Sequence, residues 1–202
     1  MNTIPGLDVL ILAGGRGSRL GGIDKATVRI SGERLIDLLL DEVSLLDALQ
    51  QVVVVSSRDL TVRPGVKKTA EEPAFSGPVS AIAAGVDELR SEAAERTAIL
   101  AVDAPESATL IPDLLEGLDD TADADVAVIR EAGGHLQPLC AVWNTESLWA
   151  ALEELGDPAD RAARALIDAT NTVVEVAGTG EERDFDTLED LAALEDFELP
   201  EA

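Results

Sequence analysis

The stretch DVLILAGGRGSRLGGIDK, residues 8–25, decides the fold of this chain. Its opening DVLIL has the length and apolar character of a buried strand, and it runs directly into Gly14 and Gly15. Glycines lack the Cβ that would keep backbone N–H groups from closing around a phosphate. Five glycines, two arginines and one lysine fall within residues 12–25. We therefore expect a strand that ends in an anion-binding loop.

The spacing of this loop matches neither of two familiar phosphate-binding loops. It is not GxxxxGK(S/T), because no Ser or Thr follows a Gly–Lys pair, and it is not the dinucleotide-binding GxGxxG. A glycine-rich turn after a strand is often only a turn. The cations Arg16, Arg19 and Lys25 favour an anion site here, since arginine offers forked contacts and lysine a compact charge.

The charge of the chain is strongly negative and unevenly spread. Its 202 residues carry 40 acidic and 15 basic side chains, a formal net charge of -25. Residues 14–34, by contrast, hold five basic and two acidic side chains. Most of the surface should repel nucleic-acid phosphates and anionic lipid headgroups, so we expect neither a nucleic acid nor a membrane as a partner. The basic island calls for an anionic ligand.

Length and cysteine usage point to one soluble domain. We expect a single domain over residues 1–202, with a frayed acidic tail at 195–202. The single cysteine, Cys140, excludes an intrachain disulfide, so a reducing cytoplasm is the expected compartment. No apolar run approaches the ~20 residues of a membrane span, and the N-terminus lacks the features of a signal peptide.

Apolar runs of strand length alternate with segments of helical period, which is the sequence form of repeated βα units. Strands are expected at residues 8–12, 51–56, 66–69, 98–102, 125–130, 137–143 and 172–176. Helices are expected at residues 34–49, 78–95, 109–118, 145–155, 161–169 and 187–194. The pattern predicts an α/β fold, a single-domain Rossmann-like three-layer sandwich whose mostly parallel sheet carries helices on both faces.

Asp103 follows one of these expected strands and precedes Pro105. Open parallel sheets bind ligands at the carboxyl ends of their strands, so this carboxylate should lie at the same edge as the glycine loop. Mg²⁺ prefers oxygen ligands and often takes one or two carboxylates together with phosphate oxygens. We expect Asp103 to bind Mg²⁺, although a turn or helix-cap aspartate is the alternative.

The loop also carries a family resemblance. Leu12-Ala13-Gly14-Gly15, followed by Arg19, Gly21-Gly22 and Asp24-Lys25, resembles the LAGGxxxRxGxxK signature of nucleotidyltransferases that join a nucleoside triphosphate to a phosphorylated acceptor. The Gly-Gly-x-Asp-Lys ending is most similar to the molybdenum cofactor guanylyltransferases. Similar landmarks follow in order: Ser76-Gly77-Pro78, Asp103-Ala104-Pro105, Gln137-Pro138-Leu139 and the stretch DFDTLEDL at residues 184–191.

The resemblance implies roles for individual residues. It implies that Arg19, Lys25 and Asp103 are catalytic, and that Mg²⁺ is held by Asp103 with Asp186 as a second ligand. Asp184 and Asp186 stand where Asn is frequent in the family, and Leu188 replaces the usual Pro, so DFDTLED as a simple helix cap is the alternative. The implied nucleotide-binding residues are Leu12, Ala13, Gly14, Gly15, Arg16, Lys25, Glu72, Gly77, Pro78 and Asp103.

The implied reaction transfers GMP from GTP to molybdopterin, the organic part of the molybdenum cofactor, and releases pyrophosphate. GTP and molybdopterin are then the partners, with transient contact with other cofactor-biosynthesis or molybdoenzyme proteins. Two alternatives stay open. One is a cytidylyltransferase for molybdopterin, or a sugar- or polyol-phosphate nucleotidyltransferase. The other is a nucleotide-binding adaptor without turnover. Asp24-Lys25 favours guanine.

Overall fold

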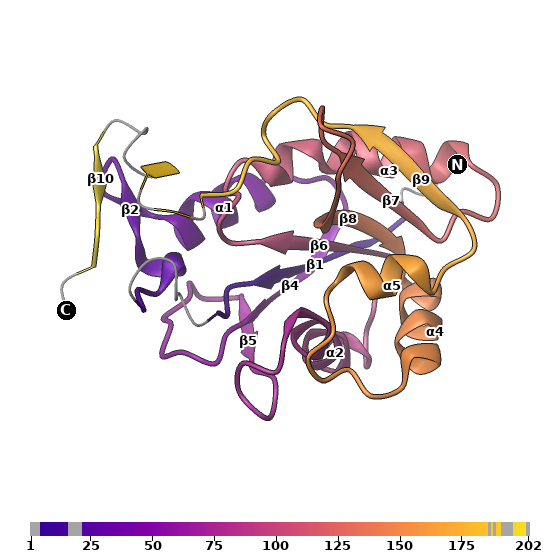
Figure 1. Ribbon diagram of the computed structural model, residues 1–202, viewed down its shortest axis with the longest axis horizontal. Helices are drawn as coiled ribbons and strands as arrows, with labels where there is room; N and C mark the ends of the chain where they lie inside the picture. The colour runs from indigo at the N-terminus through magenta and orange to yellow at the C-terminus, as the bar shows by residue number, and fades with distance from the viewer. Residues whose placement is uncertain (1–4, 16–21, 186, 188, 191–195, 201–202) are drawn as a thin grey trace.

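The computed structural model describes residues 5–15, 22–185, 187, 189–190 and 196–200. A seven-stranded sheet forms its centre, with the strands in the order β5-β4-β1-β6-β8-β7-β9 (Figure 1). These strands are β1 (Leu7–Leu12), β4 (Leu49–Val55), β5 (Lys67–Thr69), β6 (Arg96–Ala101), β7 (Val126–Arg130), β8 (Leu136–Asn144) and β9 (Val173–Ala177). Each predicted strand is present within two residues of its expected bounds.

The sheet is mostly parallel. β1 pairs in parallel with β4 on one side and with β6 on the other. β8 is inserted between β6 and β7 and runs antiparallel to both. The carboxyl ends of β1, β4 and β6 therefore meet at one edge of the sheet, and the prediction of a mostly parallel α/β sandwich is confirmed.

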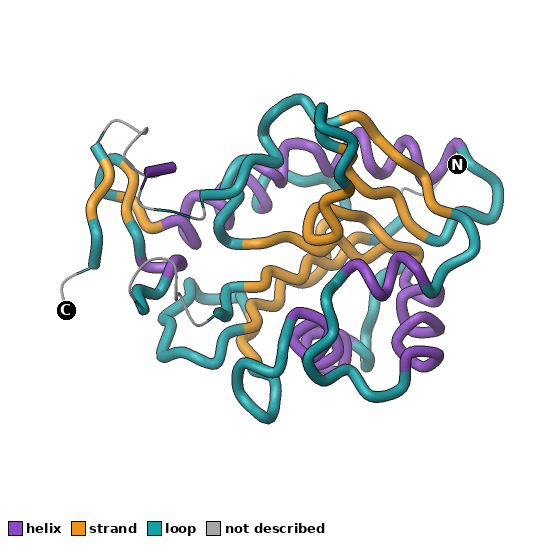
Figure 2. The backbone as a smooth tube through the Cα atoms, in the orientation of Figure 1, coloured by secondary structure: helices purple, strands orange, loops and turns teal. Residues whose placement is uncertain are grey.

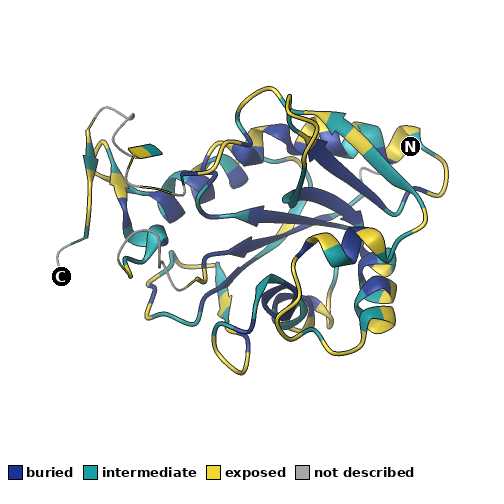
Figure 3. Cartoon of the chain, viewed as in Figure 1, coloured by how far each residue is buried: buried dark blue, intermediate teal, exposed yellow. Residues whose placement is uncertain are grey.

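Helices cover both faces of the sheet (Figure 1). Within β1, Val9 and Ile11 pack with one set of helices, whereas Leu10 and Leu12 pack with the other, because successive strand residues point to opposite faces. The strands at the centre of the sheet are accordingly buried (Figure 3). One face carries α1 (Leu35–Val43) and α3 (Ile111–Asp120), and the other carries α2 (Pro78–Leu89), α4 (Thr145–Leu155) and α5 (Arg164–Asp168).

Three helices are shorter than their periodicity predicts. The helix expected at residues 34–49 stops at Val43, because the chain reverses through Ala48, which has a φ of 56°, and enters β4 at Leu49. The helix expected at 78–95 stops at Leu89, and the N–H of Ala94 donates to the buried Asp8 carboxylate instead. The one expected at 161–169 spans Arg164–Asp168. Most of the helix expected at 187–194 lies outside the described residues.

A small second sheet was not predicted. β2 (Arg29–Ile30) lies between β3 (Glu33–Arg34) and β10 (Phe197–Glu198), with antiparallel pairing on both sides (Figure 2). Phe197 and Ile30 pack against the same core cluster. Within the tail that was expected to fray, Phe197 and Glu198 thus pair with Ile30 and Arg29, and the Phe197 side chain packs against the core.

Asp125, at the start of β7, ties three segments together. Its Oδ1 accepts a hydrogen bond from Ser147 Oγ at 2.7 Å, and its Oδ2 accepts the N–H groups of Asn171 and Thr172, each at 2.9 Å. Burial raises the pKa of Asp125, but these three hydrogen bonds outweigh burial and hold the pKa below its ordinary value of 3.8.

We expect Asp125→Asn to lower the free energy of unfolding by about 2 kcal/mol at pH 7, because an amide cannot accept all three hydrogen bonds. A lowered folded-state pKa stabilises the protein above pH 3.8 and loses that effect as the pH falls through the folded-state value. The difference between variant and wild type in urea unfolding should therefore shrink between pH 7 and pH 3. The exposed neighbour Asp123 provides the control. Asp123→Asn should change neither the free energy of unfolding at pH 7 nor its dependence on pH. A pH-independent difference for Asp125→Asn would contradict the assignment.

Within the described ranges, no helix combines the length and the apolar character that crossing a bilayer requires.

Candidate active site

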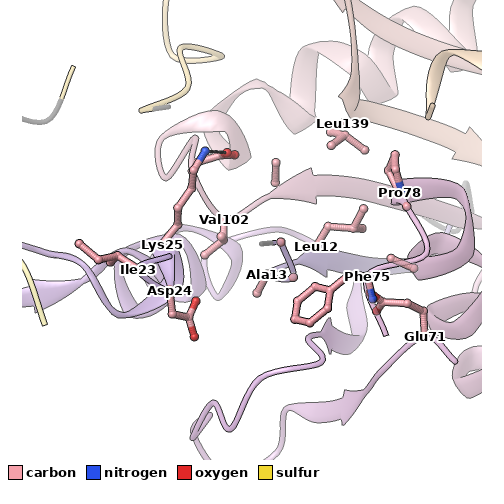
Figure 4. A pocket seen from close by; sticks show the side chains of 16 residues that line it. Leu12, Ala13, Ile23, Asp24, Lys25, Glu71, Phe75, Pro78, Val102 and Leu139 are labelled. Carbon is pink, nitrogen blue, oxygen red and sulfur yellow. Dashed lines mark hydrogen bonds and ion pairs between the residues drawn. The ribbon is translucent and has the colours of Figure 1, made fainter. Parts of the chain in front are cut away.

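A cavity of about 470 Å³ opens where β1 and β6 end, beside the first turn of α2 (Figure 4). Its walls come from the glycine loop after β1, the turn after β6, the segment that precedes α2, and Leu139 of β8. The predicted residues that line it are Leu12, Ala13, Gly14, Gly15, Lys25, Gly77, Pro78 and Asp103. The fold thus brings together residues that are up to 91 positions apart in the sequence.

The glycine loop continues the parallel hydrogen-bonding of the sheet for one residue and then leaves it. The N–H of Ala13 donates to the carbonyl of Val55 at 2.9 Å, and the N–H of Val102 donates to the carbonyl of Leu12 at 3.0 Å. Gly14 and Gly15, beyond these bonds, are exposed on the cavity wall. Arg16 and Arg19 lie outside the described residues.

Lys25 and Asp103 meet at the cavity wall. Lys25 Nζ lies 2.8 Å from Asp103 Oδ2, and each side chain is 20% exposed. Asp24 fixes the start of the 3₁₀ turn Lys25–Thr27, since its Oδ1 accepts the N–H of Ala26 at 3.1 Å. The dashed line at the tip of the labelled Lys25 side chain in Figure 4 marks its ion pair with Asp103. The site thus pairs an ammonium, which can bind phosphate, with a carboxylate, which can bind a cation.

Asp24 also lines the cavity, and its carboxyl is half-buried. Burial raises the pKa of Asp24 above its ordinary value. The hydrogen bond from the Ala26 N–H and the charges of Arg58 and Lys68 oppose that rise. Arg58, in the loop after β4, and Lys68, on β5, therefore both contribute positive potential at the Asp24 carboxylate.

Glu71 and Glu72 differ in burial and in their position relative to the cavity. Glu71 is 7% exposed and lines the cavity, whereas Glu72 is exposed and does not. Glu71 Oε1 accepts the N–H of Phe75 at 2.9 Å. Among the atoms that the structure describes, its buried Oε2 has no hydrogen-bond partner. Glu71 rather than the predicted Glu72 therefore lines the cavity, because the turn directs Glu71 inward and Glu72 to solvent.

Gly77 sets the position of the α2 N-terminus at the cavity. Its φ of 100° is accessible to glycine but strained for other residues, and a Cβ there would lie 3.4 Å from the carbonyl oxygen of Arg161. The N–H of Asp160 donates to the carbonyl of Ser76 at 2.7 Å, so the loop before α5 holds this segment in place. Pro78 then begins α2, where a missing N–H has no cost.

A second cavity of about 400 Å³ adjoins the first and shares Asp103, Pro78 and Leu139 with it. Glu182, Asp184 and Arg164 also line it. The N–H of Phe185 donates to the carbonyl of Asp103 at 2.9 Å, which holds Phe185 at the turn after β6. Two neighbouring spaces with one carboxylate between them can accommodate two reacting molecules.

The carboxylates at this edge of the sheet suit Mg²⁺, which would take its ligands from the protein and from phosphate groups. Among the described residues, no group of three or more His, Cys, Asp or Glu side chains is arranged to hold a metal ion. Mg²⁺ does not require such a group, because one or two carboxylates and phosphate oxygens are its usual ligands. Asp103 and Asp184 offer carboxylates to the same cavity, whereas Asp186 lies outside the described residues.

Cys140 lines the second cavity from β8 but is buried. Burial, together with the nearby charge of Glu182, raises the pKa of the thiol to about 12. The thiol therefore stays protonated at neutral pH and is not a nucleophile.

Sequence reasoning missed Arg58. Its Nε and Nη2 donate to the carbonyl of Gly15 at 3.2 and 3.1 Å, and its guanidinium carbon lies 5.9 Å from the centre of the Phe75 ring. One signal was available, because Arg58 follows the expected strand 51–56 and so had to lie at the same edge as the glycine loop.

Residues 9–174 match the family model described as the MobA-like NTP transferase domain. A protein of Natronomonas pharaonis named "Probable molybdenum cofactor guanylyltransferase" is 28% identical over 197 residues, which cover 94% of each chain. A "Molybdenum cofactor guanylyltransferase" of Pseudomonas putida strain GB-1 is 32% identical over 170 residues, which cover 75% of this chain and 81% of that protein.

Solved structures share the fold. The molybdopterin-guanine dinucleotide biosynthesis protein A of Archaeoglobus fulgidus superposes with a TM-score of 0.64 at 21% identity, covering 92% of this chain and 95% of that one. The 4-diphosphocytidyl-2C-methyl-D-erythritol synthase of Anaerococcus prevotii gives a TM-score of 0.67 at 13% identity, covering 93% of each chain. Proteins named for guanine and for cytosine nucleotides therefore have the same architecture.

Proposed function

Because the chain belongs to the MobA-like NTP transferase domain family, we propose that it transfers GMP from GTP to the terminal phosphate of molybdopterin and releases pyrophosphate. The observation that carries the proposal is the Lys25–Asp103 pair, 2.8 Å apart, at the wall of a cavity formed by a bare glycine loop. The relatives named as molybdenum cofactor guanylyltransferases support the acceptor and the base.

The proposed reaction depends on positioning the two substrates and on neutralising phosphate charge, and it requires no general base. An oxygen of the acceptor phosphate attacks the α-phosphorus of GTP, and the bond from that phosphorus to the β-phosphate oxygen breaks. The acceptor phosphate is ionised at neutral pH, so no side chain has to remove a proton. Lys25 would bind the triphosphate and offset the charge that develops on the leaving pyrophosphate.

Asp103 lies on both cavities and would hold Mg²⁺, with Asp184 as the second described carboxylate on the acceptor side. When bound, the ion would neutralise the charge of the phosphate groups. Lys25 forms an ion pair with Asp103 at 2.8 Å. The pair therefore holds both side chains at the cavity wall.

Glu71 supports guanine as the base. Its buried Oε2 lacks a hydrogen-bond donor among the described atoms, and such a group gains most from a ligand that supplies one. Guanine presents two adjacent donors, N1–H and the 2-amino group, whereas cytosine presents an amino group beside an acceptor. In Figure 4 Glu71 and Phe75 lie together, apart from Lys25, so the base would lie on the Glu71 side and the phosphates between the glycine loop and Lys25.

We expect Glu71→Gln to raise the KM for GTP about 10- to 100-fold and to change the KM for CTP much less, because the new amide would place a donor against the guanine donors. Glu72→Gln is the matched control, since Glu72 is exposed beside it. Competition between GTP and CTP in a pyrophosphate-release assay measures the ratio. An unchanged preference in Glu71→Gln would remove Glu71 from base selection.

The function itself is tested with molybdopterin, Mg²⁺ and each nucleoside triphosphate in turn. We expect pyrophosphate with GTP and a dinucleotide product of matching mass. A product formed with CTP alone would indicate the cytidylyltransferase. Tight GTP binding without pyrophosphate, for any phosphorylated acceptor, would indicate the adaptor and contradict the proposal.

A further inference from the structure

We infer that Arg58 is a positioning residue that joins the phosphate end and the base end of the cavity. The inference rests on the proposed function, because it concerns how that site is held ready for a nucleoside triphosphate. Arg58 does not line the cavity, but it contacts Gly15 and Phe75, both of which do.

The first contact shields a carbonyl group of the glycine loop. Two N–H groups of the guanidinium donate to the Gly15 oxygen, at 3.2 and 3.1 Å. A carbonyl oxygen carries partial negative charge and would repel a phosphate nearby. Two charged donors neutralise this oxygen and fix the plane of its peptide group. Glycine residues impose few restraints of their own, so the restraint has to come from a neighbouring side chain.

The second contact holds the base end. The guanidinium lies over the Phe75 ring, 5.9 Å from its centre. Phe75 has a φ of 62°, a conformation that is uncommon for a bulky residue and persists only where the surroundings hold it. Its N–H donates to Glu71 Oε1. A chain of contacts thus runs from Gly15 through Arg58 and Phe75 to Glu71.

Arginine can make the forked hydrogen bond and the ring contact at the same time, whereas lysine lacks the planar fork. The guanidinium is planar, so it can present two N–H groups to one oxygen while a flat face rests on a ring. An ammonium retains the positive charge but cannot make the forked, stacked arrangement. The positive charge of Arg58 also acts on Asp24, where it opposes the rise in pKa that burial causes. Replacing Arg58 by lysine therefore separates position from charge.

We expect Arg58→Ala to raise the KM for GTP about tenfold while kcat stays within about threefold of wild type, because Lys25 and Asp103 keep their own contacts. In Arg58→Lys the KM for GTP should also rise, and the rise in log KM should be more than half of the rise in Arg58→Ala. Guanidinium chloride at millimolar, non-denaturing concentration should partly restore the KM of Arg58→Ala and leave Arg58→Lys unchanged. Arg90→Ala, at an exposed ion pair with Asp87 on α2, is the control and should match wild type.

Equilibrium GTP binding and thermal unfolding are measured alongside. A lower unfolding temperature with unchanged KM would make Arg58 a structural residue only and overturn the inference. Full recovery in Arg58→Lys would overturn it in favour of simple charge. Both outcomes leave the proposed function standing, provided that wild type binds GTP and releases pyrophosphate. A wild-type protein that binds no nucleoside triphosphate would contradict the proposed function and this role together.

Discussion

Replacement of Lys25 by alanine is expected to lower kcat/KM for GTP by about 10²–10³-fold. The ammonium is placed by the Asp24-capped turn and lies 2.8 Å from Asp103, at the wall where the triphosphate would bind. Its removal takes away a charge that neutralises the leaving pyrophosphate. The pair lies at the wall of an open cavity, where water can solvate the remaining Asp103 carboxylate, so the loss should lower the unfolding temperature by only ~2–4 °C, which corresponds to about 1 kcal/mol in a domain of this size.

Steady-state kinetics and thermal unfolding of the same preparations separate these effects. Lys67→Ala is the matched control, because Lys67 also binds a polar partner, Gln51 Oε1 at 2.8 Å, but lies on β5 away from the cavity wall. It should retain wild-type activity. Wild-type turnover in Lys25→Ala would show that the pair with Asp103 is structural.

Replacement of Asp103 by asparagine is expected to lower kcat by about 10²–10³-fold and to abolish the response of the residual activity to Mg²⁺. Binding of GTP without Mg²⁺ should move in the opposite direction and become about threefold tighter, since one negative charge facing the triphosphate is removed. Lys25→Ala should weaken the same Mg²⁺-free binding. The two variants of one ion pair therefore have opposite expected signs in a titration with GTP and EDTA.

Asp119→Asn is the control for this variant, because Asp119 binds Arg96 at 2.8 Å on α3, away from both cavities. It should leave kcat and the Mg²⁺ response unchanged. If Asp103→Asn keeps a normal Mg²⁺ dependence, the metal site has to be sought elsewhere at this edge.

Much of the fold could be predicted because strands buried on both faces are continuous apolar runs. VVVV in β4 and AIL in β6 allow few other structures between helical segments. The shared edge of the sheet then predicted that Lys25 and Asp103 would lie in one site, although 78 positions separate them. The small sheet was not predicted because its strands have only two residues each, which is too short to show an alternation of apolar and polar side chains.

Periodicity could not predict the site where contacts between distant segments fix the backbone. Which acid of Glu71-Glu72 faces inward depends on the conformation of the turn before Phe75, and that turn is held by Arg58 and by the Glu71 carboxylate itself. The end of α1 was misplaced for a similar reason. The chain has to reverse at Ala48 to reach its place in the sheet, and the apolar spacing through Leu46 gives no sign of that reversal.

A ribosome delivers β6 and β7 before it delivers the strand that lies between them. Until residues 136–144 emerge, β6 has an open edge, and its Ile99 and Leu100, fully buried in the finished protein, belong to an incomplete sheet. Open edges and exposed apolar side chains favour association with other chains. Synthesis that stalls after β7 therefore leaves a four-stranded half with an aggregation-prone border, and only the arrival of β8 closes it.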